Sequence, residues 1–262
     1  MPDFWIRIGL SVLLASLLAL FALLKKSLTR PALILAWLSA IVIAYTGGIG
    51  GFLILTFTFA FTILADKIGR SRAARKKSEV RALIQIVANV GTGTLVLLLF
   101  YLLGKPEIGF FLYASAMASS LADSMASGIG VLQKRDPVSI LTFKRIPRGR
   151  SGGVSLLGLS ASLLGSAVIA GCYAAFSGKL PAALLVLAAG FLGALADSVY
   201  GALLQGKYIC AEDGAYTEKR FCHGKEARLT GGFRMIDNNT VNLMNNITAA
   251  AFGALMLLSG LI

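Results

Sequence analysis

The chain has 262 residues, of which 56% are hydrophobic and 14% charged, and its mean hydropathy is +0.78. Soluble globular proteins average roughly 45 to 50% apolar and about 25% charged residues, so this composition excludes a soluble protein and predicts an integral membrane protein. The net charge of +13 comes from Lys and Arg gathered in a few loops. We therefore interpret it as a signal of membrane topology and expect no nucleic-acid partner.

Eight apolar stretches approach the roughly 20 residues that a helix needs to cross about 30 Å of hydrocarbon. We expect an all-α fold, a polytopic bundle of about eight transmembrane helices in a single integral-membrane domain over residues 1–262. The second and third stretches are short and meet at Gly47–Gly51, so they form two crossings or one re-entrant pair, which gives seven or eight helices. The first stretch has no small-residue cleavage site, and we expect it to be retained. In chain order the stretches are Phe4–Leu24, Pro31–Tyr45, Ile49–Asp66, Ala82–Leu103, Ile108–Leu132, Val154–Phe176, Pro181–Gln205 and Thr240–Ile262.

The positive charges divide unevenly between the two sides of the membrane. If the loops are numbered alternately, one side collects 22 Lys and Arg residues and the other only three. Because Lys and Arg prefer cytoplasmic loops, we predict that both termini lie outside. We place the loops at about 67–81, 133–153 and 206–239 in the cytoplasm and the chain in the cell (plasma) membrane. A homo-oligomer remains an open alternative.

The tripeptide Leu-Ala-Asp occurs three times, at Leu64, Leu121 and Leu195. Each copy lies toward the cytoplasmic end of an odd-numbered predicted helix. This spacing predicts two-helix units repeated in parallel about an axis along the membrane normal.

Two of these aspartates, Asp123 and Asp197, lie well inside predicted spans. An Asp in the middle of a membrane helix costs about 2.5 to 3.5 kcal/mol on insertion scales, so it normally faces a polar cavity, an ion or a cation. We predict both as catalytic residues and metal ligands. Ser124 and Ser127, on the same stretch as Asp123, are candidates for substrate contact or support of the site; packing of small residues is the alternative reading.

A third polar cluster opens the last predicted helix and contains Asp237, Asn238, Asn239, Asn242 and Asn246. Spacings of three to four place several of these side chains on one helix face. Carboxylate and amide oxygens suit Mg²⁺, which typically takes one or two carboxylates while phosphates and waters complete its shell. We predict Asp237 as a third catalytic and metal-binding carboxylate, Asn238, Asn239 and Asn242 as nucleotide ligands, and Asn246 as a supporting residue. A helix-capping cluster is the alternative.

The loop FKRIPRGRSGGVS, Phe143–Ser155, combines four cations with three glycines directly before a predicted helix. Glycines allow backbone N–H groups to approach a ligand, and a helix N-terminus favours a phosphate. We predict a phosphate or nucleotide site here, and a second Gly-Gly-x-Arg segment adds a cation before the last helix. A positive-inside loop with a serine cap is the alternative. The predicted phosphate ligands are Lys144, Arg148, Gly149, Ser151, Gly152, Gly153, Ser155 and Arg234.

The three cysteines, Cys172, Cys210 and Cys222, predict neither a disulfide nor a metal framework. Cys210 and Cys222 with His223 make a partial zinc set, but the spacing is loose and no fourth ligand is evident. We expect structural or incidental roles, since cytoplasmic thiols stay reduced.

Four segments together resemble a known family: ADSMASGIG at Ala122, LTFKRIPRGRSGGVSLLGLSASLLGS at Leu141, GALADSVYGALLQ at Gly193 and DNNTVNLMNN at Asp237. They are similar to the integral-membrane family that includes human transmembrane protein nineteen and plant phytyl-phosphate kinase, which is distantly similar to dolichol kinases and phosphatidate cytidylyltransferases. The resemblance implies a kinase that converts an isoprenyl monophosphate to the diphosphate with CTP and Mg²⁺. The family pattern falls on residues Asp123, Ser127, Pro147, Gly149, Gly152, Gly153, Ser155, Asp197, Asp237, Asn238, Asn239 and Asn242. Many members carry a glutamate where this chain has Gly128.

The expected function is therefore a multi-pass kinase for an isoprenoid lipid phosphate, with a nucleoside triphosphate as co-substrate, Mg²⁺ as cofactor and the active site toward the cytoplasm. Two alternatives remain open. One is a transporter or flippase of an anionic lipid or metabolite, and the other is a nucleotidyltransferase acting on a lipid phosphate.

Overall fold

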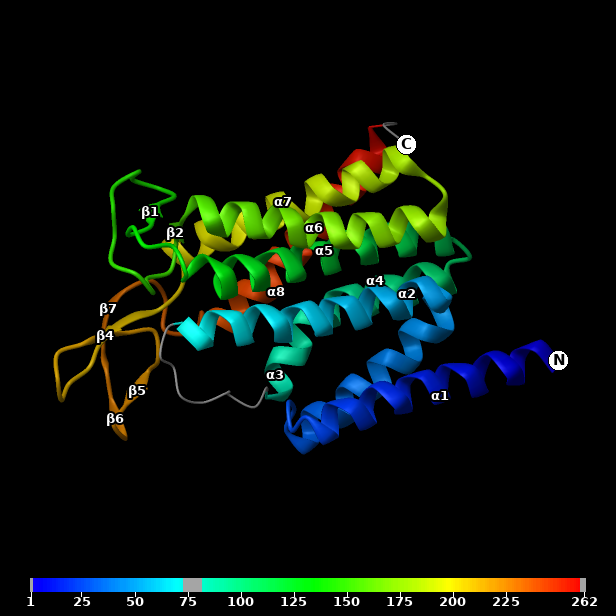
Figure 1. The fold of residues 1–262 in the computed structure, drawn as a ribbon, viewed down its shortest axis with the longest axis horizontal. Coiled ribbons are helices and arrows are strands. Elements are labelled where there is room, and N and C mark those ends of the chain that lie inside the picture. Colours follow the sequence, from blue (N-terminus) through cyan, green and yellow to red (C-terminus); the bar gives the residue numbers. More distant parts are fainter. Residues whose placement is uncertain (1, 73–81, 260–262) are drawn as a thin grey trace.

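The computed structural model describes residues 2–72 and 82–259 (Figure 1). Most of this chain is helical. The helices are α1 (Pro2–Leu24), α2 (Arg30–Arg72), α3 (Leu83–Ile86), the π-helix η1 (Val87–Gly91), α4 (Thr92–Leu102), α5 (Pro106–Gly130), α6 (Leu156–Ser177), α7 (Leu180–Leu203) and α8 (Asn238–Leu258). Within the described residues, six helical stretches are long and apolar enough to cross a membrane. The chain is therefore a multi-pass helical membrane protein, as predicted.

The second and third predicted spans form one element, α2, that turns sharply at Gly48. Gly48 has φ 61° and ψ −158°, a backbone conformation that costs little only for glycine. Figure 1 shows the halves on either side of this turn running in opposite directions. The turn at Gly48 thus makes two segments from α2, and the prediction of seven to eight helices is confirmed.

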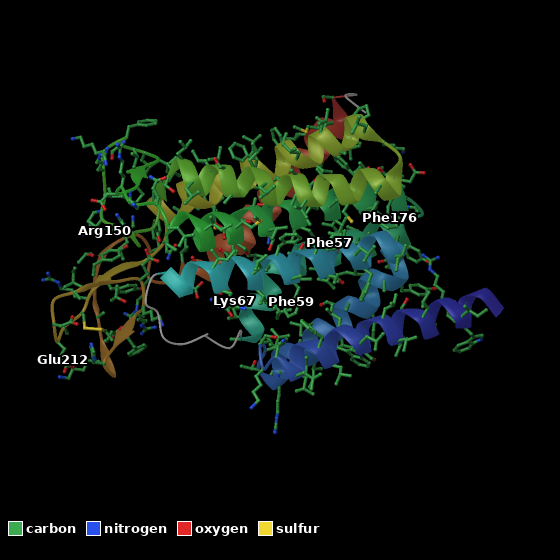
Figure 2. The ribbon with its side chains drawn as sticks, in the orientation of Figure 1. Phe57, Phe59, Lys67, Arg150, Phe176 and Glu212 are labelled. Atoms are coloured by element: carbon green, nitrogen blue, oxygen red, sulfur yellow. A yellow bond between two sulfur atoms is a disulfide. The ribbon has the colours of Figure 1, made fainter. Side chains whose placement is uncertain are left out.

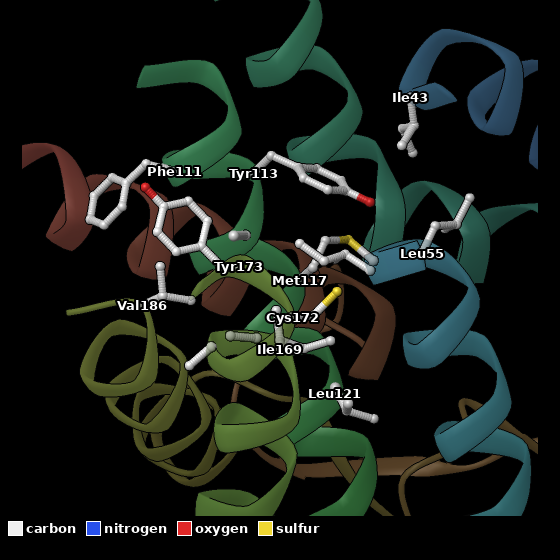
Figure 3. Packing of buried hydrophobic residues seen from close by; sticks show 14 of the residues in the cluster. Ile43, Leu55, Phe111, Tyr113, Met117, Leu121, Ile169, Cys172, Tyr173 and Val186 are labelled. Carbon is white, nitrogen blue, oxygen red and sulfur yellow. The ribbon is translucent and has the colours of Figure 1, made fainter. Parts of the chain in front are cut away.

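Helix α5 lies at the centre of the bundle, where it packs against α2, α4, α6, α7 and α8. Phe111, Tyr113, Met117 and Leu121 of α5 are almost completely buried. They meet Ile169 and its neighbours on α6 (Figure 3). The Tyr113 hydroxyl donates a hydrogen bond of 2.9 Å to the carbonyl of Gly51, just after the turn in α2. The small and polar residues of α5 are thus buried against protein, while longer apolar side chains of the outer helices remain for lipid.

The loops carry short strands that the sequence did not predict. These are β1 (Val138–Ser139), β2 (Gly153–Val154), β3 (Lys207–Ile209), β4 (Tyr216–Thr217), β5 (Phe221–Cys222), β6 (Lys225–Glu226) and β7 (Arg228–Gly231). They form antiparallel sheets of order β1-β2, β4-β3-β7 and β5-β6. Because Gly153 and Val154 pair with β1, helix α6 begins at Leu156, two residues later than the predicted span.

Figure 1 places these strands at one end of the bundle and both chain termini toward the other. We call the first end the loop end. The predicted loops at 133–153 and 206–239 lie there. Of the predicted loop at 67–81, residues 73–81 fall outside the described residues.

One expectation about the loops was wrong. Cys210 and Cys222 are joined in a disulfide, with their Cα atoms 5.7 Å apart. The β3–β4 and β5–β6 hairpins fold toward each other, so two residues that are twelve apart in sequence become neighbours. Spacing alone did not indicate this pairing. Cys172, in contrast, is a buried free thiol in the core of the bundle.

Candidate functional site

A polar cavity of about 510 Å³ opens at the loop end of the bundle. Its walls come from the ends of α2, α5 and α7, the start of α8 and the loop between α5 and α6. Twelve of the predicted site residues line it: Asp123, Ser124, Ser127, Arg148, Gly149, Ser151, Gly152, Gly153, Ser155, Asp197, Asn238 and Asn242. Segments that are more than a hundred residues apart in sequence thus meet around one space.

The aspartates of all three Leu-Ala-Asp repeats face this cavity. Asp66 comes from the end of α2, Asp123 from α5 and Asp197 from α7. The side chains of Asp123 and Asp197 are in hydrogen-bonding contact with each other. Two carboxyl groups this close repel when both are ionised, unless a proton or a cation lies between them. Asp66 belongs to the Leu-Ala-Asp repeat but was not among the predicted site residues.

Amides from α8 and the π-helix surround Asp197. Asn245 donates to Asp197 Oδ1 at 2.7 Å and accepts a bond of 3.1 Å from the Ser119 hydroxyl. The Asn242 amide lies between two partners. In one orientation of the amide its nitrogen donates to Asn89 Oδ1 at 3.2 Å. With the amide oxygen and nitrogen exchanged, the nitrogen donates to Asp197 Oδ1 at 3.3 Å. This network fixes the position of one carboxylate and leaves oxygen atoms directed at the cavity.

Gly128, where many family members carry a glutamate, lies against α2. A Cβ atom at this position would lie 2.8 Å from the carbonyl carbon of Ala65. A side chain here would therefore push α2 away from α5. Asp66, next to Ala65 on α2, lines the same cavity. In this chain a carboxylate from α2 thus faces the cavity close to position 128, where the resemblance implied a carboxylate from α5.

The glycine loop, residues 148–153, rests on the last turn of α7. Gly152 has φ 82°, and a Cβ there would lie 2.8 Å from the Cα of Ala202 and closer still to its Cβ. Only glycine tolerates both the positive φ angle and the close contact with Ala202. Gly201 on the same face would bring a Cβ to 3.3 Å from that of Ser151. The glycines therefore serve first to seat the loop on α7.

Most backbone N–H groups at the start of α6 already have partners. Ser155 caps the helix and accepts from the Gly158 N–H at 3.1 Å, and Gln133 accepts from the Leu157 N–H at 3.1 Å. Ser155 thus fills the capping role that the alternative reading assigned to it. Because these donors are occupied, the arginines of the loop are better placed than the helix start to hold a phosphate.

Three arginines line the cavity: Arg135, Arg148 and Arg150. Arg148 Nε lies 3.4 Å from Asp136, and its guanidinium also donates to the carbonyl of Lys134. Arg150 stacks over the ring of Tyr216 at 4.9 Å and projects from the loop end (Figure 2). Guanidinium groups in such positions can each present two parallel donors to a phosphate.

Glu218, which the sequence analysis missed, reaches into the cavity from the β4–β5 segment. Its Oε1 accepts from the Ser151 N–H at 2.8 Å and from the Ser151 hydroxyl at 2.5 Å. Oε2 accepts from the amide of the buried Gln205 at 2.9 Å. The Tyr216 hydroxyl donates to Oε1 at 3.1 Å, and burial together with this carboxylate raises the pKa of Tyr216. An anionic group therefore already binds the glycine loop, and no local sequence pattern marked it.

Asp237 is the N-cap of α8 and does not line the cavity. It accepts bonds of 2.9 Å from both the N–H and the hydroxyl of Thr240, and one of 3.0 Å from Asn239. Partial burial acts to raise its pKa, but these hydrogen bonds outweigh that effect and lower it. The capping alternative thus describes what Asp237 does in this structure.

Four further predicted residues also lie away from the cavity. One is Asn239, whose side-chain amide donates to Asp237. Arg234 pairs with Glu226 in the strand-bearing loop, and Lys144 is exposed. Asn246 donates to the carbonyl of Ala88 at 2.8 Å and so ties α8 to the π-helix.

An apolar pocket of about 70 Å³ adjoins the polar cavity. It lies between α1, α2, α3, η1 and α5, and small residues such as Ala15, Ala19 and Ala36 leave its space open. The two spaces share four lining residues, Thr62, Gln85, Asn89 and Ser124. Its outer wall, α1, packs mainly on α2 (Figure 1). This helix carries many exposed leucines. The apolar space thus begins among the lipid-facing helices and ends beside the acidic residues.

The cavity residues fit a magnesium ion with bound phosphates. Mg²⁺ prefers oxygen ligands and usually takes one or two carboxylates, with water and substrate phosphates completing six positions. Asp123 and Asp197 supply adjacent carboxyl groups, and Asp66 faces the same space. Arg148 and Arg150 line the same cavity and supply positive charge.

Comparisons with known proteins assign the chain to a protein family. A model described as "Integral membrane protein DUF92" matches residues 13–250. An uncharacterised membrane protein of Methanocaldococcus jannaschii is 28% identical over 78% of this chain and 86% of its own length. Protein PGR of Arabidopsis thaliana is 28% identical over 93% of both chains. The chloroplastic protein VTE6 of Arabidopsis thaliana is 25% identical over 76% of this chain and 56% of its own length.

No solved structure matches the chain significantly. The family model nevertheless covers all of the helices that build the cavity, from α2 to the cavity-facing part of α8. The chain belongs to the DUF92 family of integral membrane proteins.

Proposed function

We propose that this protein is a membrane kinase that phosphorylates an isoprenyl monophosphate of the phytyl type to the diphosphate, with CTP as the donor and Mg²⁺ as the metal. The observation that carries the proposal is the junction of the apolar pocket with the polar cavity. A molecule with a phosphate head and an apolar tail would place its head in the polar cavity and the adjoining part of its tail in the apolar pocket. The family resemblance, which extends to plant phytyl-phosphate kinase, supports the same substrate class.

Phosphoryl transfer requires the protein mainly to position the reacting groups and to neutralise their charge. An oxygen of the lipid phosphate forms a bond to the γ-phosphorus of the nucleotide, and the bond between that phosphorus and the β–γ bridging oxygen breaks. The products are the lipid diphosphate and a nucleoside diphosphate. The attacking oxygen is already anionic, so no general base is required.

Each group in the cavity then has a defined task. Asp123 and Asp197, with Asp66 lining the same cavity, would hold Mg²⁺, which would neutralise phosphate charge. Arg148 and Arg150 bind nucleotide phosphate oxygens at the open end. The tail lies in the apolar pocket, which orients the lipid phosphate toward the aspartates.

The test uses the purified full chain in detergent with Mg²⁺, labelled CTP or ATP, and phytyl or geranylgeranyl phosphate. We expect lipid diphosphate and nucleoside diphosphate in equal amounts. Asp123→Asn and Asp197→Asn should each lower turnover roughly 100-fold or more, because each removes a charge placed where phosphate charge accumulates. Asp237→Asn is the matched control, since Asn also caps helices and this residue does not line the cavity.

Each alternative function leaves a distinct signature in the same preparation. Release of pyrophosphate, with the nucleotide transferred to the lipid, would indicate a nucleotidyltransferase. Movement of the lipid phosphate across vesicles without nucleotide turnover would indicate a transporter. Failure to form a diphosphate from any pair of substrates would contradict the kinase.

A further inference from the structure

The strand-bearing loop between α7 and α8 brings together four side chains that can bind metal, none of which lines the polar cavity. The ligand atoms of Cys210, Cys222 and His223 all lie within 4.8 Å of one another. Asp213 Oδ2 lies 3.6 Å from His223 Nε2. We propose that, with its two cysteines reduced, this cluster binds one Zn²⁺ ion as a structural Cys₂-His-Asp site. The proposal is independent of the kinase function.

The geometry is close to what a zinc ion requires. Tetrahedral zinc with bonds of about 2.0 to 2.3 Å places its ligand atoms roughly 3.3 to 3.8 Å apart, with the shorter separations between nitrogen and oxygen ligands. The Asp213 and His223 atoms lie 3.6 Å apart, within ion-pair distance and close to the separation of neighbouring ligands. The sulfurs need only separate from their disulfide distance, which small side-chain rotations allow.

Two tight turns present the four ligands in pairs. Cys210 and Asp213 are separated by two residues, the usual spacing of two zinc ligands on one turn. The Gly214 N–H donates to the Cys210 carbonyl at 3.1 Å and closes this turn. Asp213 Oδ1 accepts from the Ala215 N–H at 2.9 Å, which leaves Oδ2 directed at His223.

The second turn places a histidine where the backbone disfavours one. His223 and Gly224 have φ values of 51° and 78°, as in the two-residue hairpin turns that favour Asn-Gly. A non-glycine residue in this conformation is uncommon and often marks a functional position. Here it directs an imidazole at the two sulfurs and the Asp213 carboxylate.

The loop needs a cross-link of this kind to be stable. Strands β4, β5 and β6 contain two residues each, and such short hairpins are marginal in water without a staple. A metal ion at the cluster would join the β3–β4 turn to the β5–β6 turn. The same loop carries Glu218, whose bonds to Ser151 connect it to the rim of the cavity.

The predicted topology favours metal over disulfide. The excess of Lys and Arg predicts that the loop end is cytoplasmic, where cysteine pairs remain reduced and commonly bind metal. Binding of Zn²⁺ by two thiols releases two protons and needs no oxidant. The same pair of sulfurs thus serves as a disulfide when oxidised and as two zinc ligands when reduced.

The test measures metal binding by the full chain purified in detergent with a non-chelating phosphine reductant. We expect one Zn²⁺ per chain by elemental analysis. After exchange with Co²⁺ we expect the visible bands of a tetrahedral ion and a thiolate-to-cobalt charge-transfer band. Cys222→Ser should abolish both signals. His223→Asn keeps a residue that tolerates the turn but removes the imidazole, and it should weaken Zn²⁺ binding at least tenfold in competition with a chelator.

Cys172→Ala is the matched control, because Cys172 is buried in the core and distant from the loop in sequence and in fold; it should leave both signals unchanged. Reduced protein with three titratable thiols that binds neither Zn²⁺ nor Co²⁺ would overturn the proposal. So would a Cys210–Cys222 bond that resists the reductant in the folded chain. Equal metal binding by wild type, Cys222→Ser and His223→Asn would likewise overturn it.

Discussion

Replacing Gly152 with alanine tests whether the glycine loop is held on α7 by close packing. The substitution forces an L-residue into φ 82°, which costs about 1 to 2 kcal/mol. It also places a methyl group 2.8 Å from the Ala202 Cα and closer to its Cβ, and such overpacking typically costs about 1 to 3 kcal/mol more. We therefore expect the free energy that holds the loop against α7 to fall by about 2 to 5 kcal/mol.

Gly149→Ala is the matched control for backbone strain. Gly149 has φ 80°, but a Cβ there would meet no atom within 4 Å. In this variant the packed loop should be destabilised by only about 1 to 2 kcal/mol, because only the dihedral angle is unfavourable. The difference between the two variants isolates the contact with Ala202.

Hydrogen exchange of the segment 138–155 reports the effect, because the Ile140 N–H bonds at 2.9 Å to the carbonyl of Gly152, the residue that contacts Ala202. One to two kcal/mol corresponds to about 5- to 30-fold in an opening equilibrium. We expect exchange to accelerate by roughly that factor in Gly149→Ala and by a further factor of five or more in Gly152→Ala. Equal exchange rates in the two variants would refute the close contact between the loop and α7.

Three further predictions concern the cap of α8, the apolar pocket and Glu218. Asp237→Ala should destabilise the protein by about 1 kcal/mol and Asp237→Asn by only a few tenths, as measured by denaturant titration in detergent. Because its folded-state pKa is lowered, the contribution of Asp237 is present above its unfolded pKa of about 3.9 and is lost as pH falls through the folded value; a cap contribution that persists below that value would contradict this. Ala19→Phe fills the apolar pocket and should shift the preference of the proposed kinase toward shorter isoprenyl chains, whereas Leu17→Phe, at an exposed position of α1, should not. Glu218→Ala leaves Ser151 and Gln205 without their shared acceptor and should increase protease cleavage of the loop between α7 and α8; an unchanged cleavage rate would show that these bonds do not anchor it.

The helices could be predicted from sequence with good success because the signal is local. An apolar stretch of about 20 residues crosses a membrane whatever its neighbours are, so the predicted spans agree with the helices to within a few residues at most ends. The turn at Gly48 was marked by its glycines. The strands were not predicted, since β1 and β2 exist only because residues 138–139 and 153–154 meet across a loop.

The candidate site could be predicted at positions where a charged residue inside a membrane helix is energetically unfavourable. Asp123 and Asp197 stand out because a carboxylate inside a membrane helix requires a polar neighbour, and both line the cavity. Asp237 also stood out, but an Asp just before a helix satisfies backbone N–H groups equally well, and in the structure it does so. Asp66 and Glu218 carried no such distinguishing signal.

The sequence by itself determined the membrane class, the positions of the spans, the aspartates that need a polar environment and the family. Each of these depends on residue type and on spacing within one segment. Only the tertiary structure decided that Asp66 joins Asp123 and Asp197, that Glu218 binds the glycine loop, that an apolar pocket meets the polar cavity, and that Cys210 lies beside Cys222 and His223. These depend on how helices rotate and pack and on where loops fold back, and such contacts between distant segments leave no periodicity in a single chain.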